Sequence, residues 1–529
     1  MVFPKKKNII IMSTPPTFVE ERLCPLGLIP VPILKMITFL KKFKNKVTYI
    51  NLHSGEALDR YSVVHPNEVV EWKEKRICRE GNKKAMMYIN GRDFKFFEKS
   101  LREVDGKPDE FWISCSFTTD YDLVADYIKI VRKHFPKIKV VAGGDFVRFS
   151  PELAKKVGAE DYFTERLPEA DLCRLDFSVC DKWSYGLFQL QTGCVNKCSF
   201  CVIGKDRPVK FDPKEVINYI KEFHAEYRPD NYWNWDPNVT LYPKVLEEFL
   251  DLYIEARLPA ALNFGKGLQP NLVNEEILKK MARANTYSVT LPMECANYET
   301  TKRLNKPYTI ISSIKLLDMA KRCGLRMNEC RCTSLLGYPD DDFKSFFRIY
   351  ISILKYGAAP SPFPVFLFPN SPDYHNYYDL IKNKDLSELH GQLWPLLSEK
   401  DMEKYKNLFK FIELSNFRSV KDNLHLLSKD LKEILLKELE NSDRFISLCL
   451  NSPKDNIEEF GRIEKELNMK KVKKTKNLLY VVANPKSTQK AISKQLGEYF
   501  INKYQKTNPY TKVTVVDLYK EGLTYINEE

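Results

Sequence analysis

Three closely spaced cysteines are the residues of this chain that point most directly to chemistry. Cys194, Cys198 and Cys201 follow a C-x-x-x-C-x-x-C spacing in a loop that a glycine opens. Three thiolates can hold one inorganic cluster, but a four-iron cluster needs four outer ligands, so one iron would stay open to another molecule. A zinc loop and three unrelated buried thiols are the alternatives. A structural zinc site needs a fourth ligand, and His224 and Cys295 lie far along the chain at no zinc spacing.

The aromatic residue Phe200, just before the last cysteine, completes a motif that resembles the radical S-adenosylmethionine (SAM) superfamily. The resemblance implies a [4Fe–4S] cluster on the three cysteines and SAM at the open iron. It further implies reductive cleavage of SAM to a 5′-deoxyadenosyl radical, and an electron donor such as flavodoxin or ferredoxin. It does not identify the reaction or the substrate.

The bulk composition indicates several globular domains in a reducing compartment. At 529 residues, the chain is long enough for two to four domains. Its 83 Lys+Arg against 70 Asp+Glu give a net charge of +13, which favours a solvated lysine-rich surface over a nucleic-acid partner. The 13 irregularly placed cysteines, without a secretory signal or an apolar run of ~18 residues, predict a cytoplasmic protein with reduced thiols and no membrane partner.

The first third of the chain alternates buried strands with amphipathic helices, which is typical of a doubly wound, Rossmann-like sheet. Such a sheet binds ligands at the carboxyl ends of its strands. The region 56–105 is less patterned and is interpreted as an insertion. Strands are predicted at 8–12, 46–51, 111–116 and 139–145, and helices at 32–43 and 120–135.

The details of this half resemble the cobalamin-binding domain that precedes many radical SAM modules. The family's Pro-Leu-Gly-Leu segment, Ser-rich strand end and Gly-Gly strand end all have counterparts here. The resemblance implies that hydroxyl groups bond the polar tail of cobalamin and that glycines admit a close approach. The implied contacts are Pro25, Leu26, Gly27, Ser114, Ser116, Thr118, Gly143 and Gly144.

Two features of this half leave alternatives open. The D-x-H-x-x-G motif that supplies a cobalt ligand in other cobalamin proteins is absent, and His53 after the second strand is interpreted as a loop residue. A degenerate domain that binds nothing is the structural alternative. Further along, Cys330 and Cys332 could suggest a second cluster, but a C-x-C pair in a strand without partner cysteines favours buried thiols.

The catalytic module repeats a strand and a helix every ~25–35 residues, which predicts a parallel sheet with crossover helices. The count fits the partial (β/α)6 barrel of the radical SAM superfamily, with its site at the carboxyl ends of the strands. Strands are predicted at 188–191, 231–236, 261–264, 288–294, 326–336 and 364–368. Helices are predicted at 213–226, 244–256, 274–284, 312–322 and 343–355.

The resemblance also implies contacts to SAM in this module. Asp236 stands where relatives place an acidic residue near the amino group of SAM, and Glu294 where a glutamate meets its ribose or methionine part. The Gly337-x-Pro339 turn and the backbone around Phe200 would flank the adenine. Ordinary strand-end capping is the structural alternative for both acids.

The last sixty residues form a separate pattern of strand, helix and strand. They resemble the amino-terminal βαβ unit of FMN-dependent NADH azoreductases and quinone reductases, in which 484–487 and Ser493 would hold the flavin phosphate. Two parallel strands and one helix cannot cover both faces of a sheet, so no working FMN site is expected. A truncated or fused reading frame, with Met469 as a former start, is the interpretation.

Taken together, the sequence predicts an α/β protein in five parts. These are a Rossmann-like cobalamin-binding domain at 1–165, a connector at 166–186, a radical SAM partial barrel at 187–370, a helical region at 371–468 and an incomplete flavodoxin-like tail at 469–529. The leading functional hypothesis is a cobalamin-dependent methyltransferase that methylates a carbon or phosphorus centre of a small molecule. Radical cyclisation or rearrangement without methyl transfer, and a non-catalytic metal- or RNA-binding protein, are the alternatives.

Overall fold

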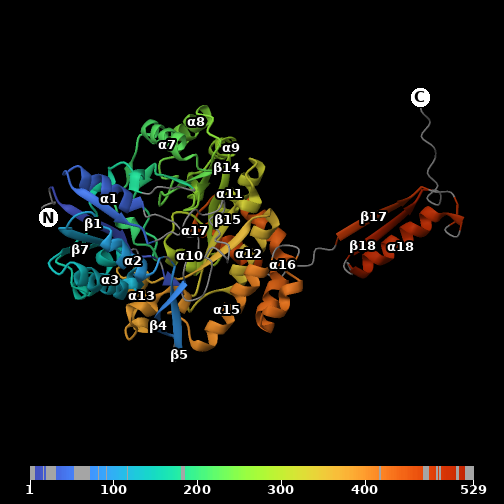
Figure 1. Ribbon diagram of the computed structural model, residues 1–529. Helices are drawn as coiled ribbons and strands as arrows, with labels where there is room; N and C mark the ends of the chain where they lie inside the picture. The colour runs from blue at the N-terminus through green and yellow to red at the C-terminus, as the bar shows by residue number, and fades with distance from the viewer. Residues whose placement is uncertain are drawn as a thin grey trace. The chain divides into compact units, whose positions relative to one another are not determined.

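The computed structural model describes most of the chain in two compact units, 1–464 and 465–529 (Figure 1). Each unit is treated by itself below. The finer division into five domains stays a prediction. The described residues are 6–15, 17–18, 31–52, 72–80, 83–90, 92–115, 117–179, 185–415, 419–468, 476–483, 486–487, 490–507 and 511–518.

The first unit begins with a parallel five-stranded sheet in the order β3-β1-β6-β7-β8. Its inner strand β1 is apolar on both faces, and residues 9–12 are at most 2% exposed, as helices on both sides require. One face packs against α1 and the other against α2 and α3. The strands are β1 (Asn8–Ser13), β3 (Lys46–Ile50), β6 (Glu110–Ser114), β7 (Lys139–Gly143) and β8 (Asp161–Tyr162); the helices are α1 (Val31–Lys41), α2 (Phe94–Arg102) and α3 (Tyr121–His134). The predicted doubly wound fold is confirmed.

The expected insertion at 56–105 is only partly correct. Strands β4 (Trp72–Glu80) and β5 (Lys83–Asn90) form an antiparallel pair that β2 (Thr17–Phe18) extends, apart from the main sheet. Helix α2, however, belongs to the core, because Phe97 and Leu101 are 0% and 1% exposed. Its apolar residues alternate with lysines and arginine, so the region as a whole reads as polar.

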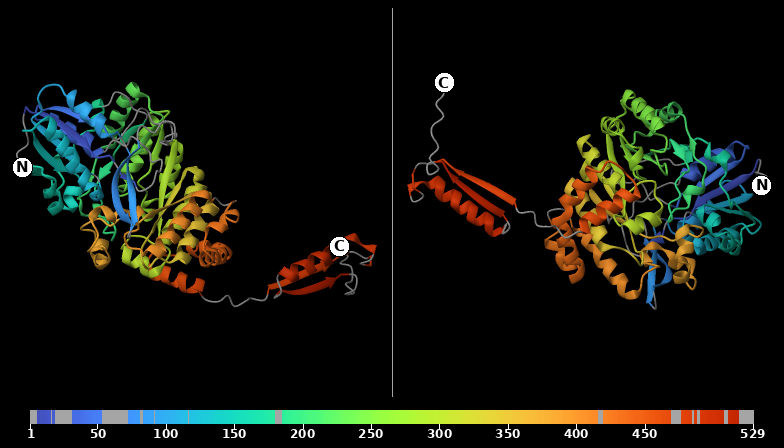
Figure 2. Two further views of the ribbon diagram at one scale, coloured as in Figure 1. Left: turned by 60° about the horizontal axis from the view of Figure 1, so that its bottom comes forward. Right: turned by 180° about the vertical axis from the view of Figure 1, so that it is seen from behind.

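The centre of the unit is a second parallel sheet of six strands, in the order β16-β15-β14-β13-β12-β9 (Figure 2). The expected partial (β/α)6 architecture is therefore present. The strands are β9 (Gly186–Phe188), β12 (Asn231–Asn234), β13 (Ala261–Phe264), β14 (Thr286–Glu294), β15 (Arg331–Leu336) and β16 (Ala359–Pro364). The crossover helices are α7 (Pro213–Tyr227), α8 (Pro243–Glu255), α9 (Glu275–Arg283), α11 (Ile310–Arg322) and α12 (Phe343–Tyr356), with a short α10 (Tyr298–Leu304) before α11.

The last strand of this sheet lies earlier in the chain than the predicted 364–368. Strand β16 carries prolines at 360, 362 and 364 and pairs only with β15. Proline lacks the N–H that a central strand needs, but an edge strand has one side free of pairing and tolerates it. The first strand also ends early: β10 (Gln191–Thr192) leaves the sheet and pairs antiparallel with β11 (Val209–Lys210).

A helical region completes the first unit, as expected. Helices α15 (Glu399–Leu414) and α16 (Lys429–Leu450) pack through apolar residues on α12. A buried ion pair joins α12 to α16, with Arg348 Nε 2.8 Å from Glu438 Oε2. The shorter helices are α13 (Pro372–Asn376), α14 (Tyr378–Ile381) and α17 (Ile457–Asn468).

The second unit has the strand, helix and strand that the sequence predicts. Strands β17 (Lys476–Val482) and β18 (Thr511–Asp517) pair in parallel, and α18 (Ile492–Thr507) connects them. Apolar residues of this unit stay in contact with solvent, for example Leu479 at 61% and Ile492 at 75% exposed. A two-layer unit of this size leaves one sheet face without a covering helix.

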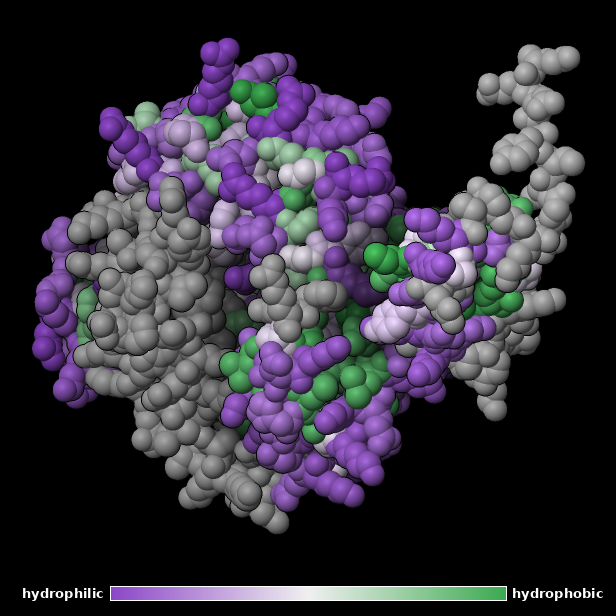
Figure 3. Space-filling view, turned by 90° about the vertical axis from the view of Figure 1, so that its right-hand side faces the viewer, coloured by the Kyte–Doolittle hydropathy of each residue, from purple (hydrophilic) through white to green (hydrophobic). Residues whose placement is uncertain are grey.

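Among the described residues, no helix is long and apolar enough to span a bilayer. The molecular face drawn in Figure 3 is hydrophilic over most of its coloured surface, with hydrophobic patches between. This mixture agrees with the lysine-rich composition.

Candidate active site

The cysteine loop depends on two glycines for its shape. Gly193 has a φ of +67°, and an added Cβ would lie 2.7 Å from the carbonyl oxygens of Asp206 and Arg207. At Gly204 an added Cβ would lie 1.9 Å from the carbonyl oxygen of Asn196. A side chain at either position would push the loop open, so the glycines fold the segment tightly back on itself.

The three thiols lie in this folded loop, close enough for each to influence the next. Burial is the main cause that raises the pKa of Cys198 to about 11. The Lys306 ammonium group opposes this shift, and charges on Cys201 and Cys194 add to it. Burial also raises the pKa of Cys201, which backbone hydrogen bonds from Ile203 and Gly204 oppose. In the described part of the chain, no three His, Cys, Asp or Glu side chains converge as ligands of a single metal ion. The donor set is one buried and two half-buried thiols, with N–H donors at one sulfur, and it suits an iron–sulfur cluster.

A buried ion pair lies beside the loop. Lys306 Nζ contacts the Glu294 carboxylate, and their side chains are 11% and 13% exposed. The same ammonium group donates to the Tyr308 hydroxyl at 2.7 Å and lies 5.4 Å from the centre of the Phe200 ring. Glu294, at the carboxyl end of β14, has a φ of +49° where the pairing with β15 slips. The predicted Glu294 therefore does face the cysteine loop, in a conformation that costs energy.

Asp236 supports the backbone that leads into the loop. Its carboxylate is fully buried and accepts hydrogen bonds from the N–H of Leu190 at 2.9 Å and of Gln191 at 3.2 Å. Burial raises the pKa of Asp236 to about 7, although these donors favour its charged form. The geometry is that of strand-end capping, the structural alternative in the sequence.

An amide network fixes the other side of the loop. Gln269 Oε1, after β13, accepts from Asn196 Nδ2 at 2.9 Å and from Asn238 Nδ2 at 2.8 Å. Thr240 Oγ1 in turn accepts from the Gln269 N–H at 2.8 Å. The ends of β12 and β13 therefore hold the loop through side chains that sequence reasoning did not single out.

The Gly337-x-Pro339 turn lies at the end of β15, as expected. Gly337 has a φ of +110°, and an added Cβ would lie 3.1 Å from the Trp394 ring. Its N–H donates to Asp341 at 2.5 Å, and burial raises the pKa of Asp341 to about 7. Pro339 is exposed, so the buried residue of the turn is Tyr338, which is 1% exposed.

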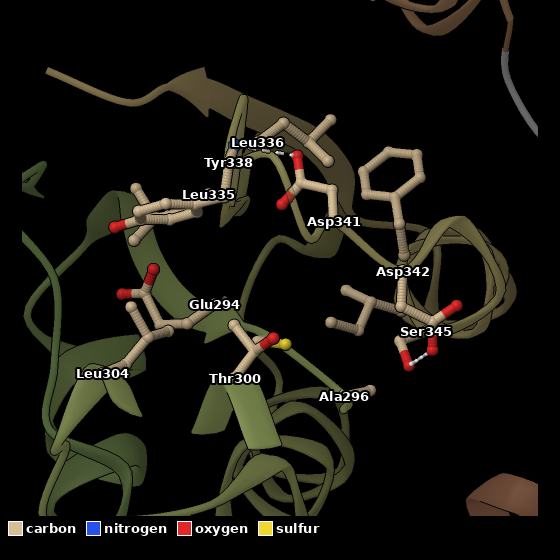
Figure 4. Close-up of a pocket in the computed structure, with 13 residues that line it drawn as sticks. Glu294, Ala296, Thr300, Leu304, Leu335, Leu336, Tyr338, Asp341, Asp342 and Ser345 are labelled. Carbon is tan, nitrogen blue, oxygen red and sulfur yellow. Dashed lines mark hydrogen bonds between the residues drawn. The ribbon is translucent and has the colours of Figure 1, made fainter. Parts of the chain in front are cut away.

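A cavity borders this turn. It has an empty volume of about 370 Å³, partly open to solvent, between the ends of β14 and β15 and helices α10 and α12. Glu294, Leu304, Tyr338 and Asp341 are among its lining residues (Figure 4). Glu294 therefore belongs both to the ion pair beside the cysteine loop and to the lining of the cavity.

The helical region closes against the loop. Asp373, at the start of α13, is fully buried, and its N–H donates to the Ser199 carbonyl at 2.9 Å. Its carboxylate accepts from the Tyr338 hydroxyl at 2.6 Å. Arg303 lies 4.1 Å over the Tyr338 ring and 3.8 Å from Asp373.

The amino-terminal sheet presents the predicted hydroxyls and glycines at one edge. Ser114 ends β6 beside Ser13 of β1, and the buried Ser13 hydroxyl has no hydrogen-bond partner within the described part of the chain. Thr118 is 3% exposed. Gly144 has a φ of +86°, and an added Cβ would lie 2.4 Å from the Cys115 carbonyl, so strand packing itself requires this glycine.

Gly143 has no such requirement, because its Cβ would make ordinary contacts at 3.6 Å. The expected contacts Pro25, Leu26, Gly27 and Ser116, and also His53, lie outside the described residues.

Asp206 joins the two halves of the unit, which the sequence did not reveal. Its carboxylate lies 2.6 Å from Arg148 of α4 (Asp145–Phe149), the helix that follows Gly144, and 3.0 Å from Arg166 of the connector. Its carbonyl oxygen accepts from the Cys194 N–H at 3.4 Å. One residue thus ties the cysteine loop to the helix that follows the Gly-Gly end of β7 in the amino-terminal sheet.

The C-x-C pair is structural. Cys330 and Cys332 are 1% and 0% exposed. Their burial agrees with the interpretation of buried thiols.

Comparison with known proteins supports this picture of the central module. Residues 188–349 match the model of the Radical SAM superfamily. The solved structure of the radical SAM methyltransferase TsrM from Kitasatospora setae, with tryptophan substrate and a SAM analogue, aligns at a TM-score of 0.51 and 14% identity, over 69% of this chain and 75% of that one. That similarity concerns the fold. A tRNA-2-methylthio-N(6)-dimethylallyladenosine synthase of Finegoldia magna is 19% identical over 294 residues, 51% of this chain and 62% of that protein.

Other matches are short. An FMN-dependent NADH:quinone oxidoreductase of Coprothermobacter proteolyticus is 38% identical over 52 residues, 10% of this chain and 26% of that protein. The chain spans about a quarter of the length of these curated relatives. They give weak support to the resemblance of the tail to flavin reductases.

Proposed function

We propose that this chain, which contains a radical SAM domain, is a cobalamin-dependent enzyme that methylates a carbon or phosphorus centre of a small molecule. The observation that carries the proposal is Asp206, which bonds at once to the cysteine loop and to Arg148 at the edge of the amino-terminal sheet. A methyl carrier in that sheet and a radical source in the barrel must face one substrate. The Asp206 contacts hold those two edges in register.

The cluster and SAM would occupy the loop and the ends of the barrel strands. Cys194, Cys198 and Cys201 would hold the cluster, and the Glu294–Lys306 pair with the Gly337 turn would orient SAM. When bound, these groups supply a one-electron cleavage of SAM that yields a carbon radical, and cobalamin supplies the methyl group. Asp373 of the helical region, bonded to Ser199 of the cysteine loop, would close the site and exclude water from the radical.

The amino-terminal edge would hold cobalamin through groups at the carboxyl ends of its strands. The Ser13 hydroxyl is buried and unpartnered at the carboxyl end of β1. Buried polar groups are normally hydrogen-bonded, so this hydroxyl fits a ligand with polar substituents. Ser114, Thr118 and Gly143 would complete the edge, together with Pro25, Leu26, Gly27, Ser116 and Gly144.

The test is anaerobic incubation of the reconstituted protein with SAM, a reductant and hydroxocobalamin, followed by mass spectrometry of all products. Methylation with this cofactor set consumes two SAM, so we expect S-adenosylhomocysteine, 5′-deoxyadenosine and a methylated compound together. Formation of 5′-deoxyadenosine without S-adenosylhomocysteine would instead indicate cyclisation or rearrangement. A protein that binds zinc and no iron would contradict both.

We further propose a small electron-transfer protein such as flavodoxin or ferredoxin as the reductant, and no nucleic-acid substrate. No function is assigned to the tail. Its resemblance covers only the first strands of a flavin domain.

A further inference from the structure

The inner face of the six-stranded sheet carries two cations that no carboxylate offsets. On β12, Tyr232 packs against the crossover helices, with its hydroxyl 3.2 Å from the Ile220 carbonyl. Side chains alternate along a strand, so Trp233 faces the opposite, inner side. Its register partner Asn263 on β13 shares that side, as does Ser288, the partner of Asn263 on β14.

Arg331 lies on the same inner face. Cys332, Ser334 and Leu336 of β15 are buried, and Leu336 packs on α12, so the alternating residues point inward. Arg331 is exposed and pairs in register with Thr290, whose hydroxyl donates to the Gly265 carbonyl at 3.0 Å. Thr290 therefore places Arg331 level with Gly265.

Lys266 follows Gly265 and points across the same level. Its Nζ lies 4.1 Å from the centre of the Trp235 ring. The side chain reaches solvent, yet desolvation by the surrounding protein lowers the pKa of Lys266. Among the described residues, neither Lys266 nor Arg331 forms an ion pair.

Asn263 adds a polar atom to the inner side of the sheet. The residue is 7% exposed, and its buried Oδ1 has no hydrogen-bond partner among the described residues. A Cβ added to Gly265 would lie 3.2 Å from this atom and 3.6 Å from the Trp233 ring, so the glycine keeps the space above both groups open. Buried amide oxygens rarely lack a donor, which points to a ligand that supplies one.

We infer that these side chains on the inner side of the sheet form the substrate subsite of the enzyme, and that the subsite takes an anionic small molecule with a planar group. Lys266 and Arg331 would bind its carboxylate or phosphate, Trp233 and Trp235 would stack on its plane, and Asn263 would accept an N–H or O–H. This assignment rests on the proposed function, since it places the substrate opposite the cysteine loop.

The position along β15 suits that role. Leu335, on the same face, belongs to the apolar cluster that includes Phe200 of the cysteine loop. Arg331 precedes Leu335 by four residues, which is about 13 Å along a strand. A substrate whose anionic group binds Lys266 and Arg331 would therefore extend toward the cysteine loop. Its reacting atoms would lie at the end nearer the loop, away from the anionic group.

The test compares each of two aromatic anions with its neutral counterpart by calorimetric titration of the reconstituted holoprotein. The probes are 4-aminobenzoate against 4-aminobenzamide, and phenyl phosphate against phenol. We expect at least one anion to bind about tenfold or more tightly than its counterpart, as charge-assisted hydrogen bonds allow. The double variant Lys266→Gln, Arg331→Gln should abolish this preference. The matched control Lys244→Gln, Arg283→Gln, at exposed cations on α8 and α9, should retain it.

A second measurement separates the substrate from the carboxylate of SAM. The double variant should bind SAM and release 5′-deoxyadenosine, without substrate, at the wild-type level. If the double variant loses both this reaction and the anion preference, the two cations bind SAM and the inference is overturned. The inference is also overturned if the wild-type protein shows no anion preference, or if the preference survives the substitutions. Because probe binding needs no turnover, anion binding by a protein that never cleaves SAM would contradict the proposed function alone.

Discussion

At the scale of single residues, Glu294 and Lys306 show how the site is held before any ligand arrives. Glu294 has a left-handed backbone at a break in the β14–β15 pairing, a conformation that costs about 1–3 kcal/mol. Lys306 holds its carboxylate in place from a segment twelve residues further along. The ion pair therefore offsets the backbone strain at Glu294, a conformation that persists only because the surrounding structure holds it.

Substitution Lys306→Met would leave the Glu294 carboxylate buried without its cation. Breaking one partner of a buried pair costs about 3–5 kcal/mol, so we expect a comparable loss in the free energy of unfolding. Urea unfolding measures it, with Lys302→Met, an exposed lysine of α10, as the matched control. Weaker SAM binding should accompany the loss, and equal stabilities of the two variants would contradict this view of the pair.

Asp236 gives a dependence of stability on pH. Burial raises the pKa of this carboxyl from 3.8 to about 7 in the folded protein. Between those values the folded state binds more protons than the unfolded state, so the contribution of Asp236 to stability falls as pH rises. Each unit of pKa shift is worth about 1.4 kcal/mol, so wild type should lose up to about 3 kcal/mol relative to Asp236→Asn between pH 5 and 8.

Guanidinium unfolding of the two proteins at several pH values measures this difference. A constant stability gap between wild type and variant over that range would show that Asp236 keeps an ordinary pKa.

The residues that the sequence identified share one property, namely that their partners are near in the chain or belong to a known motif. The cysteine spacing, Phe200 and the Gly337 turn are local patterns. The partners of Asp206 are 58 and 40 residues away, and nothing in a local pattern distinguishes it from the many surface acids of the chain. Asp206 lies next to the cysteine motif, and its arginine partners follow the Gly-Gly strand end. This combination can be recognised as an ion-pair site only once the topology of the chain is known.

At the scale of elements, Asp206 makes the cysteine loop depend on α4 and the connector. Asp206→Asn would remove the charge that two arginines share. Loss of an outer partner typically costs about 10- to 100-fold in metal affinity, so iron should leave the reconstituted variant faster by a factor in that range. Anaerobic transfer of iron to a coloured chelator follows the release.

Glu152→Gln, at a side chain that is 84% exposed, is the control for the loss of one acidic charge in the same half of the unit. If Asp206→Asn releases iron at the same rate as that control, the cysteine loop keeps its shape without the ion pairs of Asp206.

Element types could be predicted from periodicity, whereas the edges of the sheets could not. The strands at 8–12 and 261–264 are continuous or bounded apolar runs, and the structure has them there. The sequence did not predict strand β16, because its prolines argue against a central strand. Only the order of the strands shows that it lies at an edge of the sheet. The sequence did not predict helix α2, because its two core residues are interleaved with charged ones.

At the scale of the whole molecule, the tail has a sheet of its own. Its two described strands, β17 and β18, pair with each other. A buried pair between Lys494 and Asp517, 3.0 Å apart, links α18 to β18 within the tail. The tail therefore has its own internal contacts, and the proposed chemistry uses none of its residues.

Removal of 469–529 should leave the first unit intact. Independent parts change stability additively within about 0.5 kcal/mol, so the unfolding midpoint of the first unit and its rate of SAM cleavage should stay near the full-length values. Circular dichroism melts and product chromatography on both proteins make the comparison. A truncated protein that folds but no longer cleaves SAM would give the tail a role that the present account lacks.

The central claim is that Cys194, Cys198 and Cys201 hold the cluster that cleaves SAM, and one measurement tests it most directly. Wild type, Cys198→Ala and Cys332→Ala are reconstituted with iron and sulfide under anaerobic conditions, then given SAM and dithionite, and 5′-deoxyadenosine is quantified. The account predicts formation of 5′-deoxyadenosine by wild type and by Cys332→Ala, and none by a folded Cys198→Ala. Formation of 5′-deoxyadenosine by Cys198→Ala at the wild-type rate would contradict it.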